Sequence, residues 1–211
     1  MKKHPLPYVI RPMEPGDVPA VGAIERLSFP TPWPTSSFLY ELGNHARSSY
    51  HVLLKPENSD TARFRRGWRR WLRGVVDRPE ESRVIGYVGF RRQSTSVHIS
   101  TLAVHPKWRG KGLGELLLLT AMEKALELGG SAVSLEVRAS NQVAQSLYRK
   151  YGFRFTNVHR GYYRDGEDAW LMEAQVNVDT YRTRLARLRQ MLEARLRCPP
   201  ADVGQNDADT L

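Results

Sequence analysis

The chain has little of what disulfide-bonded, metal-binding and membrane proteins need. Its 211 residues include one cysteine, Cys198, so a single copy can form neither an internal disulfide nor a thiolate metal cluster. The six histidines are scattered, and His98 and His105 lack the i, i+4 spacing of a helical metal site. No apolar run approaches the roughly 20 residues of a membrane span, and residues 1–5 lack the apolar core of a signal peptide. We therefore expect a cytoplasmic protein with no metal site and no membrane span.

Positive charge is in excess and is unevenly distributed. The formal net charge is +10, which favours acidic partners such as nucleic acid, ribosomes, anionic lipid or a polyphosphate cofactor. Part of this charge belongs to one short segment, 63–75, which holds six arginines. The length and the 41% hydrophobic content suit one globular domain with additions.

Hydrophobic periodicity predicts an α/β protein in which strands and helices alternate through the centre of the chain. Strands are predicted at 8–11, 50–54, 84–90, 97–104, 132–137, 153–155 and 169–173. Helices are predicted at 18–27, with Asp17 as the cap, at 35–42, at 113–128, and from the Ser140-Asn141 cap to Gly152, carrying Val143, Leu147 and Tyr148. The central order indicates a mixed sheet flanked by helices.

A glycine-rich basic turn connects a predicted strand to a predicted helix. It reads Arg109-Gly110-Lys111-Gly112-Leu113-Gly114, and its glycines allow positive φ and close approach to a ligand. The unpaired N–H groups of the following helix favour an anion at the same place. The spacing fits neither a nucleotide-hydrolysing P-loop nor a Rossmann fingerprint. The turn is therefore either a phosphate site of another kind or a plain surface loop that caps a helix.

Two residues could carry proton transfer. Glu136 shares a strand face with Ser134 and Arg138, and a carboxylate within a covered sheet needs a polar site or a shifted pKa. Its alternative role is a salt bridge to Arg138 or to another cation. Tyr148 lies on the apolar face of its helix, where an aromatic ring is ordinarily part of the core. The pattern alone leaves both alternatives open.

Several motifs, taken in order, closely resemble the RimI family of GNAT N-terminal acetyltransferases. They are the turn Arg-x-x-Gly-x-Gly at 109–114, the segments LEVRASN at 135–141, LYRKYGF at 147–153, RGYY at 160–163 and DGEDA at 165–169, and a proline-tryptophan turn at 29–33. The resemblance runs from about residue 8 to 172, interrupted by 56–82. It implies a GNAT fold and transfer of an acetyl group from acetyl-CoA to the α-amine of a protein N-terminus, with alanine as the expected first residue and a ribosomal protein as a candidate substrate.

The resemblance also implies roles for individual residues. Glu136 would be the general base and Tyr148 the general acid. The cofactor would be held by Leu102, Ala103, Val104, Arg109, Gly110, Lys111, Gly112, Leu113, Gly114 and Asn141. The substrate N-terminus would be bound by Phe29, Trp33, Tyr162 and Tyr163.

Two additions flank the expected acetyltransferase domain, residues 1–176. Residues 56–82 form an insert, in which 63–75 reads as an amphipathic, arginine-faced helix. This helix either contacts RNA or ribosomes or packs its tryptophans on the domain and leaves its arginines solvated. Residues 177–198 read as a helix that either packs on its own domain or dimerises, and 199–211 as a disordered tail.

Three functions remain open on the sequence. The first is protein N-terminal acetylation by direct attack on acetyl-CoA. The second is acetylation of lysine or of a small amine on the same scaffold. The third is a ribosome- or RNA-binding module with weak catalysis, against which the intact Glu136, Tyr148 and glycine turn argue.

Overall fold

A seven-stranded mixed sheet forms the centre of the protein in the computed structural model, which describes residues 6–44, 47–56, 83–176 and 179–197. The strand order is β1-β2-β3-β4-β5-β7-β6. The strands are β1 (Val9–Pro12), β2 (Ser48–Leu54), β3 (Val84–Gln93), β4 (Ser96–Val104), β5 (Ala132–Arg138), β6 (Arg154–His159) and β7 (Ala169–Gln175). β4 and β5 are parallel, and every other neighbouring pair is antiparallel.

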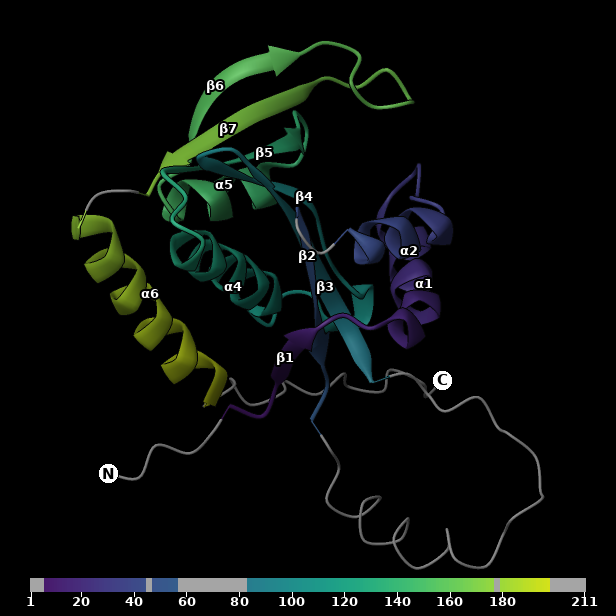
Figure 1. Ribbon diagram of the computed structural model, residues 1–211, viewed down its shortest axis with the longest axis horizontal. Coiled ribbons are helices and arrows are strands. Elements are labelled where there is room, and N and C mark those ends of the chain that lie inside the picture. Colours follow the sequence, from purple (N-terminus) through teal and green to yellow (C-terminus); the bar gives the residue numbers. More distant parts are fainter. Residues whose placement is uncertain (1–5, 45–46, 57–82, 177–178, 198–211) are drawn as a thin grey trace, which may run out of the picture.

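Helices cover both faces of this sheet. They are α1 (Val18–Ser28), α2 (Thr35–Gly43), α4 (Leu113–Glu127), α5 (Gln142–Lys150) and α6 (Asp179–Arg197). In Figure 1, α1 and α2 lie on one side of the sheet, whereas α4 and α5 lie on the other with α6 outside α4. The strands and helices predicted within the described residues are confirmed, with ends that differ by a few residues.

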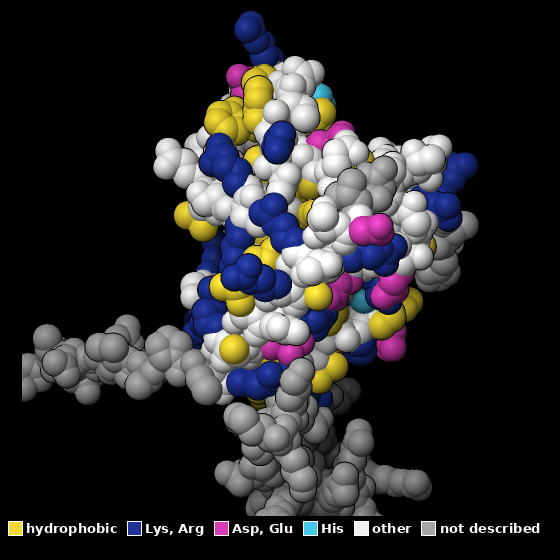
Figure 2. Space-filling view, turned by 90° about the vertical axis from the view of Figure 1, so that its left-hand side faces the viewer, with side chains coloured by type: hydrophobic (Ala, Val, Ile, Leu, Met, Phe, Trp, Pro, Cys, Tyr) yellow, Lys and Arg dark blue, Asp and Glu magenta, His cyan; other side chains and the backbone are white. Residues whose placement is uncertain are grey.

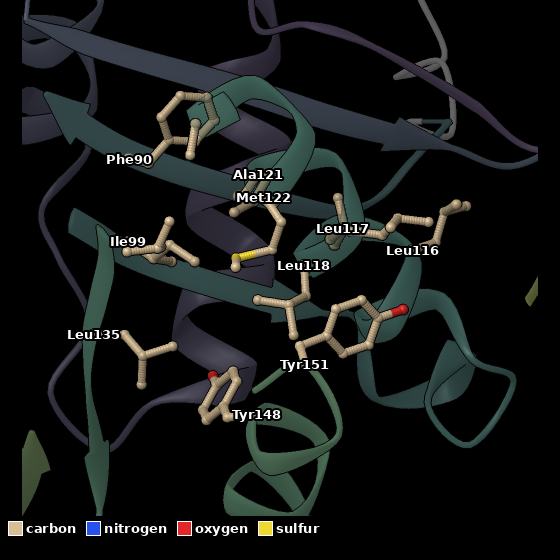
Figure 3. Packing of buried hydrophobic residues seen from close by; sticks show 14 of the residues in the cluster. Phe90, Ile99, Leu116, Leu117, Leu118, Ala121, Met122, Leu135, Tyr148 and Tyr151 are labelled. Atoms are coloured by element: carbon tan, nitrogen blue, oxygen red, sulfur yellow. The ribbon is translucent and has the colours of Figure 1, made fainter. Parts of the chain in front are cut away.

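Two hydrophobic cores correspond to these two layers. The larger core joins α4, α5 and α6 to one face of the sheet through residues such as Leu117, Met122 and Leu135 (Figure 3). The smaller core joins α1 and α2 to the other face around Phe38 and Tyr87. Residues that alternate along the strands supply both cores, as expected for a sheet covered on both sides.

β4 and β5 separate halfway along their length. Their parallel pairing runs from Ser96 with Ala132 to Ile99 with Leu135 and then ends, although both strands continue. At the same point the pairing of β4 with β3 shifts by one residue, so that Ser100 has no partner on β3. Such a bulge bends the strand that carries it. The pairing is therefore open between the C-terminal half of β4 and the end of β5, and we call this break in the sheet the gap.

One local prediction is wrong. Asp17 does not cap α1 with its side chain, because its carboxylate binds the Arg11 guanidinium and the Glu14 N–H group instead. Val143 is 84% exposed, because the apolar face of the short helix α5 turns Leu147 and Tyr148 to the core and leaves Val143 on the solvent side.

The C-terminal helix packs on its own domain. α6 buries Tyr181, Leu185, Leu192 and Leu196 in the larger core, so its apolar stripe is already covered.

Segment 63–75 and the tail at 199–211 lie outside the described residues. In the part of the chain that the structure describes, no helix has the length and hydrophobicity to cross a membrane, and no cluster of three or more His, Cys, Asp or Glu side chains suits a metal ion.

Candidate active site

The glycine turn lies where the gap between β4 and β5 meets the start of α4. Gly110 and Gly112 have φ values of 76° and 80°, a region that other residues rarely adopt. Gly112 is the N-cap residue of α4 and no side chain caps the helix there. The N–H groups of the first turn of α4 therefore have no partner within the helix and suit an anion.

The Arg109 side chain is held by groups of the protein itself. Its Nε donates to the Val104 carbonyl at 3.0 Å, and its Nη2 donates to Ser28 Oγ at 2.9 Å. The guanidinium thus ties the turn to the end of β4 and to α1. Lys111 Nζ, by contrast, lies over the ring of Trp108, 5.2 Å from its centroid. Its positive charge therefore remains beside the glycine turn.

The bulge on β4 carries an unpaired polar atom. Ser100 Oγ is buried and has no hydrogen-bond partner among the described residues. A buried hydroxyl without a partner is costly, so Ser100 Oγ would be stabilised by a polar ligand group at the bulge. Leu102, Ala103 and Val104 follow on the same strand, beyond the last pair with β5. Their predicted role in holding the cofactor arm is consistent with this position.

Glu136 forms a chain of contacts with two histidines. Its Oε2 lies 3.1 Å from His98 Nε2, and its Oε1 lies 3.9 Å from His159 Nδ1. His98 Nδ1 in turn lies 3.0 Å from Ser134 Oγ. Ser134 is the β5 partner of His98 in the parallel register, so the register places His98 beside the carboxylate. The alternative of an Arg138 salt bridge is wrong.

The pKa of Glu136 lies below its ordinary value. Burial pushes this pKa upward, but the hydrogen bond to His98 and the charges of His98 and His159 have the larger combined effect and lower it. The side chain keeps 15% exposure. Glu136 is therefore ionised at neutral pH and can accept a proton.

Tyr148 is both part of the core and close to the gap. Its ring packs on Phe153, with centroids 5.7 Å apart, and Figure 3 shows it beside Leu135 of β5 with its hydroxyl oxygen turned toward the strands. Burial raises its pKa to about 12. The described residues supply no hydrogen-bond partner for this hydroxyl, so it keeps its proton and can donate it to an occupant of the gap.

The loop between β6 and β7 brings two tyrosines to Glu136. Tyr162 and Tyr163 pack edge to face at 5.2 Å, and Tyr162 also contacts the His159 ring at 5.8 Å. Burial and the Glu136 charge raise the pKa of Tyr162. Arg138 lies 4.0 Å from the centroid of the Tyr163 ring. The loop thus forms an aromatic wall next to the carboxylate.

Arg138 and Ser140 hold this loop in place through Glu167. Arg138 Nη1 donates to Glu167 at 2.6 Å, and the backbone N–H and hydroxyl of Ser140 both donate to the same carboxylate. These bonds lower the pKa of Glu167 to about 2, the bonds from Ser140 most of all. The loop position therefore depends on the end of β5.

The proline-tryptophan turn at 29–33 is held by contacts with the smaller core and with α1. Phe29 and Trp33 are partly buried against the smaller core, and the Trp33 N–H donates to Glu25 on α1 at 3.1 Å. Burial raises the pKa of Glu25 to about 7, and the Tyr87 hydroxyl also donates a hydrogen bond to the Glu25 carboxylate.

Asn141 caps α5, as the sequence predicts, by accepting a hydrogen bond from the Ala144 N–H at 3.1 Å.

Comparison with known proteins decides the family. The profile of the Acetyltransferase (GNAT) family matches residues 19–153, a range that contains Glu136, Tyr148 and the whole glycine turn. The chain belongs to the GNAT acetyltransferase family. The fold of this acetyltransferase, a mixed sheet with a gap between β4 and β5 and helices on both faces, is the GNAT fold.

Relatives of this acetyltransferase act on protein N-termini according to their names. The chain is 32% identical over 169 residues to a candidate ribosomal protein bS18-alanine N-acetyltransferase of Bacillus subtilis, covering 80% of this chain and 95% of that one. It is 31% identical to an N-alpha-acetyltransferase of Sulfurisphaera tokodaii, covering 79% and 92%. It is also similar to the ribosomal-protein-S18-alanine N-acetyltransferase of Escherichia coli, with 25% identity, a TM-score of 0.63 and coverage of 81% and 95%.

His98 is the site residue that sequence reasoning missed. Its spacing along the chain indicates only that it is not part of a helical metal site, and gives no sign that it faces Glu136. The signal that could have found it is the register of β4 against β5, because pairing His98 with Ser134 puts His98 on the face of Glu136. Such a register is set by the whole sheet and not by either strand alone.

Proposed function

We propose that this acetyltransferase modifies the α-amine of a protein N-terminus, with alanine as the preferred first residue. The observation that carries the proposal is that β5, which borders the gap, has the ionised Glu136 on one face and the protonated Tyr148 packed beside Leu135 on the other. The named functions of the relatives support it. A ribosomal protein is the substrate that those names suggest.

The residues around the gap fit acetyl-CoA, the acetyl donor of the family. The turn from Gly110 to Gly114 would hold its pyrophosphate through backbone N–H groups, and the unpaired edge of β4 would hold its pantetheine arm. Ser100 Oγ would gain a hydrogen-bond partner there. When bound, the cofactor supplies an acetyl thioester that an amine can attack.

Glu136 would remove a proton from the substrate amine. An amine attacks a carbonyl carbon when it is neutral, and the pKa of an α-ammonium group, about 7.7–8.0, is far below the lysine value near 10.4. A single carboxylate, acting directly or through a water molecule, is sufficient for the α-amine. The site thus favours a chain terminus over lysine on chemical grounds.

Tyr148 would supply a proton on the opposite side of the reaction. Its phenol stays protonated because its pKa is about 12, and it can donate its proton to the departing sulfur. Cys198, the single cysteine of the chain, follows α6 in the sequence and lies outside the described residues. Direct transfer with no acylated enzyme is therefore the mechanism we propose.

A pair of matched peptides tests the proposed function. One peptide has a free N-terminal alanine and no lysine, and the other has the same sequence with a blocked N-terminus and one internal lysine. We expect CoA release from acetyl-CoA with the free terminus and a rate at least about 100-fold lower with the blocked peptide. Equal rates would move the function to lysine chemistry, and the absence of turnover with both would favour a small-amine substrate.

His98→Ala gives a pH test of the carboxylate. The groups that face Glu136 are His98 of β4, His159 of β6 and the tyrosines of the β6–β7 loop. Without His98, only the His159 charge and a backbone hydrogen bond oppose the effect of burial, so the pKa of Glu136 rises. The acidic limb of kcat/KM should then move to higher pH, so the ratio of wild-type to variant activity is larger at pH 6 than at pH 8. Parallel pH profiles, measured with one peptide, would contradict this role.

A further inference from the structure

The helix α6 reaches the glycine turn from outside the matched family region. The family profile ends at residue 153, whereas α6 spans Asp179–Arg197. The alignment with the Escherichia coli structure covers 95% of that chain but 81% of this one. A contact from α6 to the turn therefore comes from outside the residues that the family profile matches.

Three polar contacts fix α6 on the helices that carry the site. The Tyr181 hydroxyl donates to the Tyr151 carbonyl at 2.9 Å, and Arg184 Nη2 donates to the Lys150 carbonyl at 2.8 Å. Arg189 forms an ion pair with Glu123 of α4. Together with the buried leucines of α6, these contacts give its last turn a defined place beside the start of α4.

Arg195 is the residue of that last turn that meets the glycine turn. Its Nη2 lies 2.6 Å from Glu115 Oε2. The same atom lies 2.7 Å from the point that a Cβ atom on Gly112 would occupy. Gly112 thus leaves room for the guanidinium as well as adopting a positive φ. The Arg195 side chain remains 51% exposed, so it has free surface toward a ligand.

The charge around Glu115 is not balanced. This buried carboxylate is shared by Lys150 of α5 and Arg195 of α6, and its pKa is lowered because bonds to both cations outweigh the effect of burial. Two cations on one carboxylate leave one positive charge in excess beside the turn. The side chain of Arg109, which the resemblance assigns to the cofactor site, donates to the Val104 carbonyl and to Ser28.

We propose that Arg195 contacts a phosphate group of the coenzyme A moiety, so that α6 forms part of the cofactor site. This inference rests on the proposed function, because it assumes that the glycine turn binds this cofactor. A guanidinium suits a phosphate through charge and paired N–H groups. Figure 2 shows the α6 side of the molecule, where Lys and Arg side chains are spread over the surface. Arg195 is distinguished from the other arginines of α6 by its contact with the turn.

Calorimetric titration of the full chain with CoA tests the contact without relying on activity. We expect Arg195→Ala to weaken CoA binding at least about tenfold and Arg195→Lys to restore part of that loss. The charge-matched control is Arg187→Ala, an exposed arginine two turns earlier on α6, which should bind like the wild type. Thermal melting of each variant checks that α6 stays folded.

Shortened ligands separate a phosphate contact from a general loosening of the site. Pantetheine lacks every phosphate group, so its affinity should be equal in the wild type and in Arg195→Ala. Dephospho-CoA, which lacks the 3′-phosphate, distinguishes the two phosphate sources. If Arg195→Ala no longer weakens the binding of dephospho-CoA, the contact is to the 3′-phosphate. If Arg195→Ala still weakens it, the contact is to the pyrophosphate. CoA affinity within twofold of the wild type, or an equal loss for pantetheine, would overturn the inference. A wild-type chain that does not bind CoA would instead contradict the proposed function itself.

Discussion

Glu136→Gln should lower kcat by about 100- to 1,000-fold while leaving the affinity for acetyl-CoA almost unchanged. General-base catalysis typically contributes about 10²–10⁴ to a rate, and glutamine keeps the shape of the side chain but cannot accept the proton. His98 can still donate to the amide oxygen of glutamine, so the local structure should persist. Initial rates of CoA release with an alanine-initiated peptide, together with a CoA titration, measure both quantities.

Glu127→Gln is the matched control for this variant. Glu127 lies at the end of α4, where it is largely exposed and pairs with Lys124, so its change removes the same charge away from the site. It should leave kcat within about twofold. If Glu136→Gln also retained full activity, Glu136 would not be the base, and His98 or His159 would have to accept the proton.

Tyr148→Phe should have the second-largest effect, a fall of about 100-fold in kcat with little change in stability. The hydroxyl has no hydrogen-bond partner among the described residues, and phenylalanine preserves the ring contact with Phe153. The variant therefore removes an acidic proton and little else. Initial rates and a thermal melt, run on the same preparation, measure the two effects.

Tyr181→Phe provides the converse control. Its hydroxyl is buried and donates to the Tyr151 carbonyl, so its removal should cost about 0.5–1.5 kcal/mol of stability. Its kcat should be unchanged because the residue lies away from the gap. A Tyr148→Phe enzyme that is fully active would show that Tyr148 acts as a core residue alone.

Local patterns predicted the secondary structure well because most elements here follow their own hydrophobic periodicity. The apolar residues of α4 recur at helical spacing, and those of β5 alternate with polar residues. The glycine turn between strand and helix can also be recognised in the sequence. The Asn141 cap was predicted for the same reason, since capping depends on residues three apart. These features depend on neighbours in sequence.

The missed features depend on contacts between distant segments. The bulge at Ser100 and the pairing of His98 with Glu136 follow from the register of three strands. The hydrogen bond from Arg109 to Ser28 requires the end of α1 to lie next to the glycine turn. The contact of Arg195 with Gly112 joins residues 83 positions apart, through a helix whose packing partner the sequence left open.

The most direct test of the account lets both kinds of amine compete within one molecule. A peptide with a free N-terminal alanine and an internal lysine is incubated with acetyl-CoA and the enzyme, and fragmentation mass spectrometry locates the acetyl group. The account predicts acetylation of the α-nitrogen, with the lysine unmodified until the terminus is consumed. Acetyl groups found first on the lysine would contradict an N-terminal acetyltransferase.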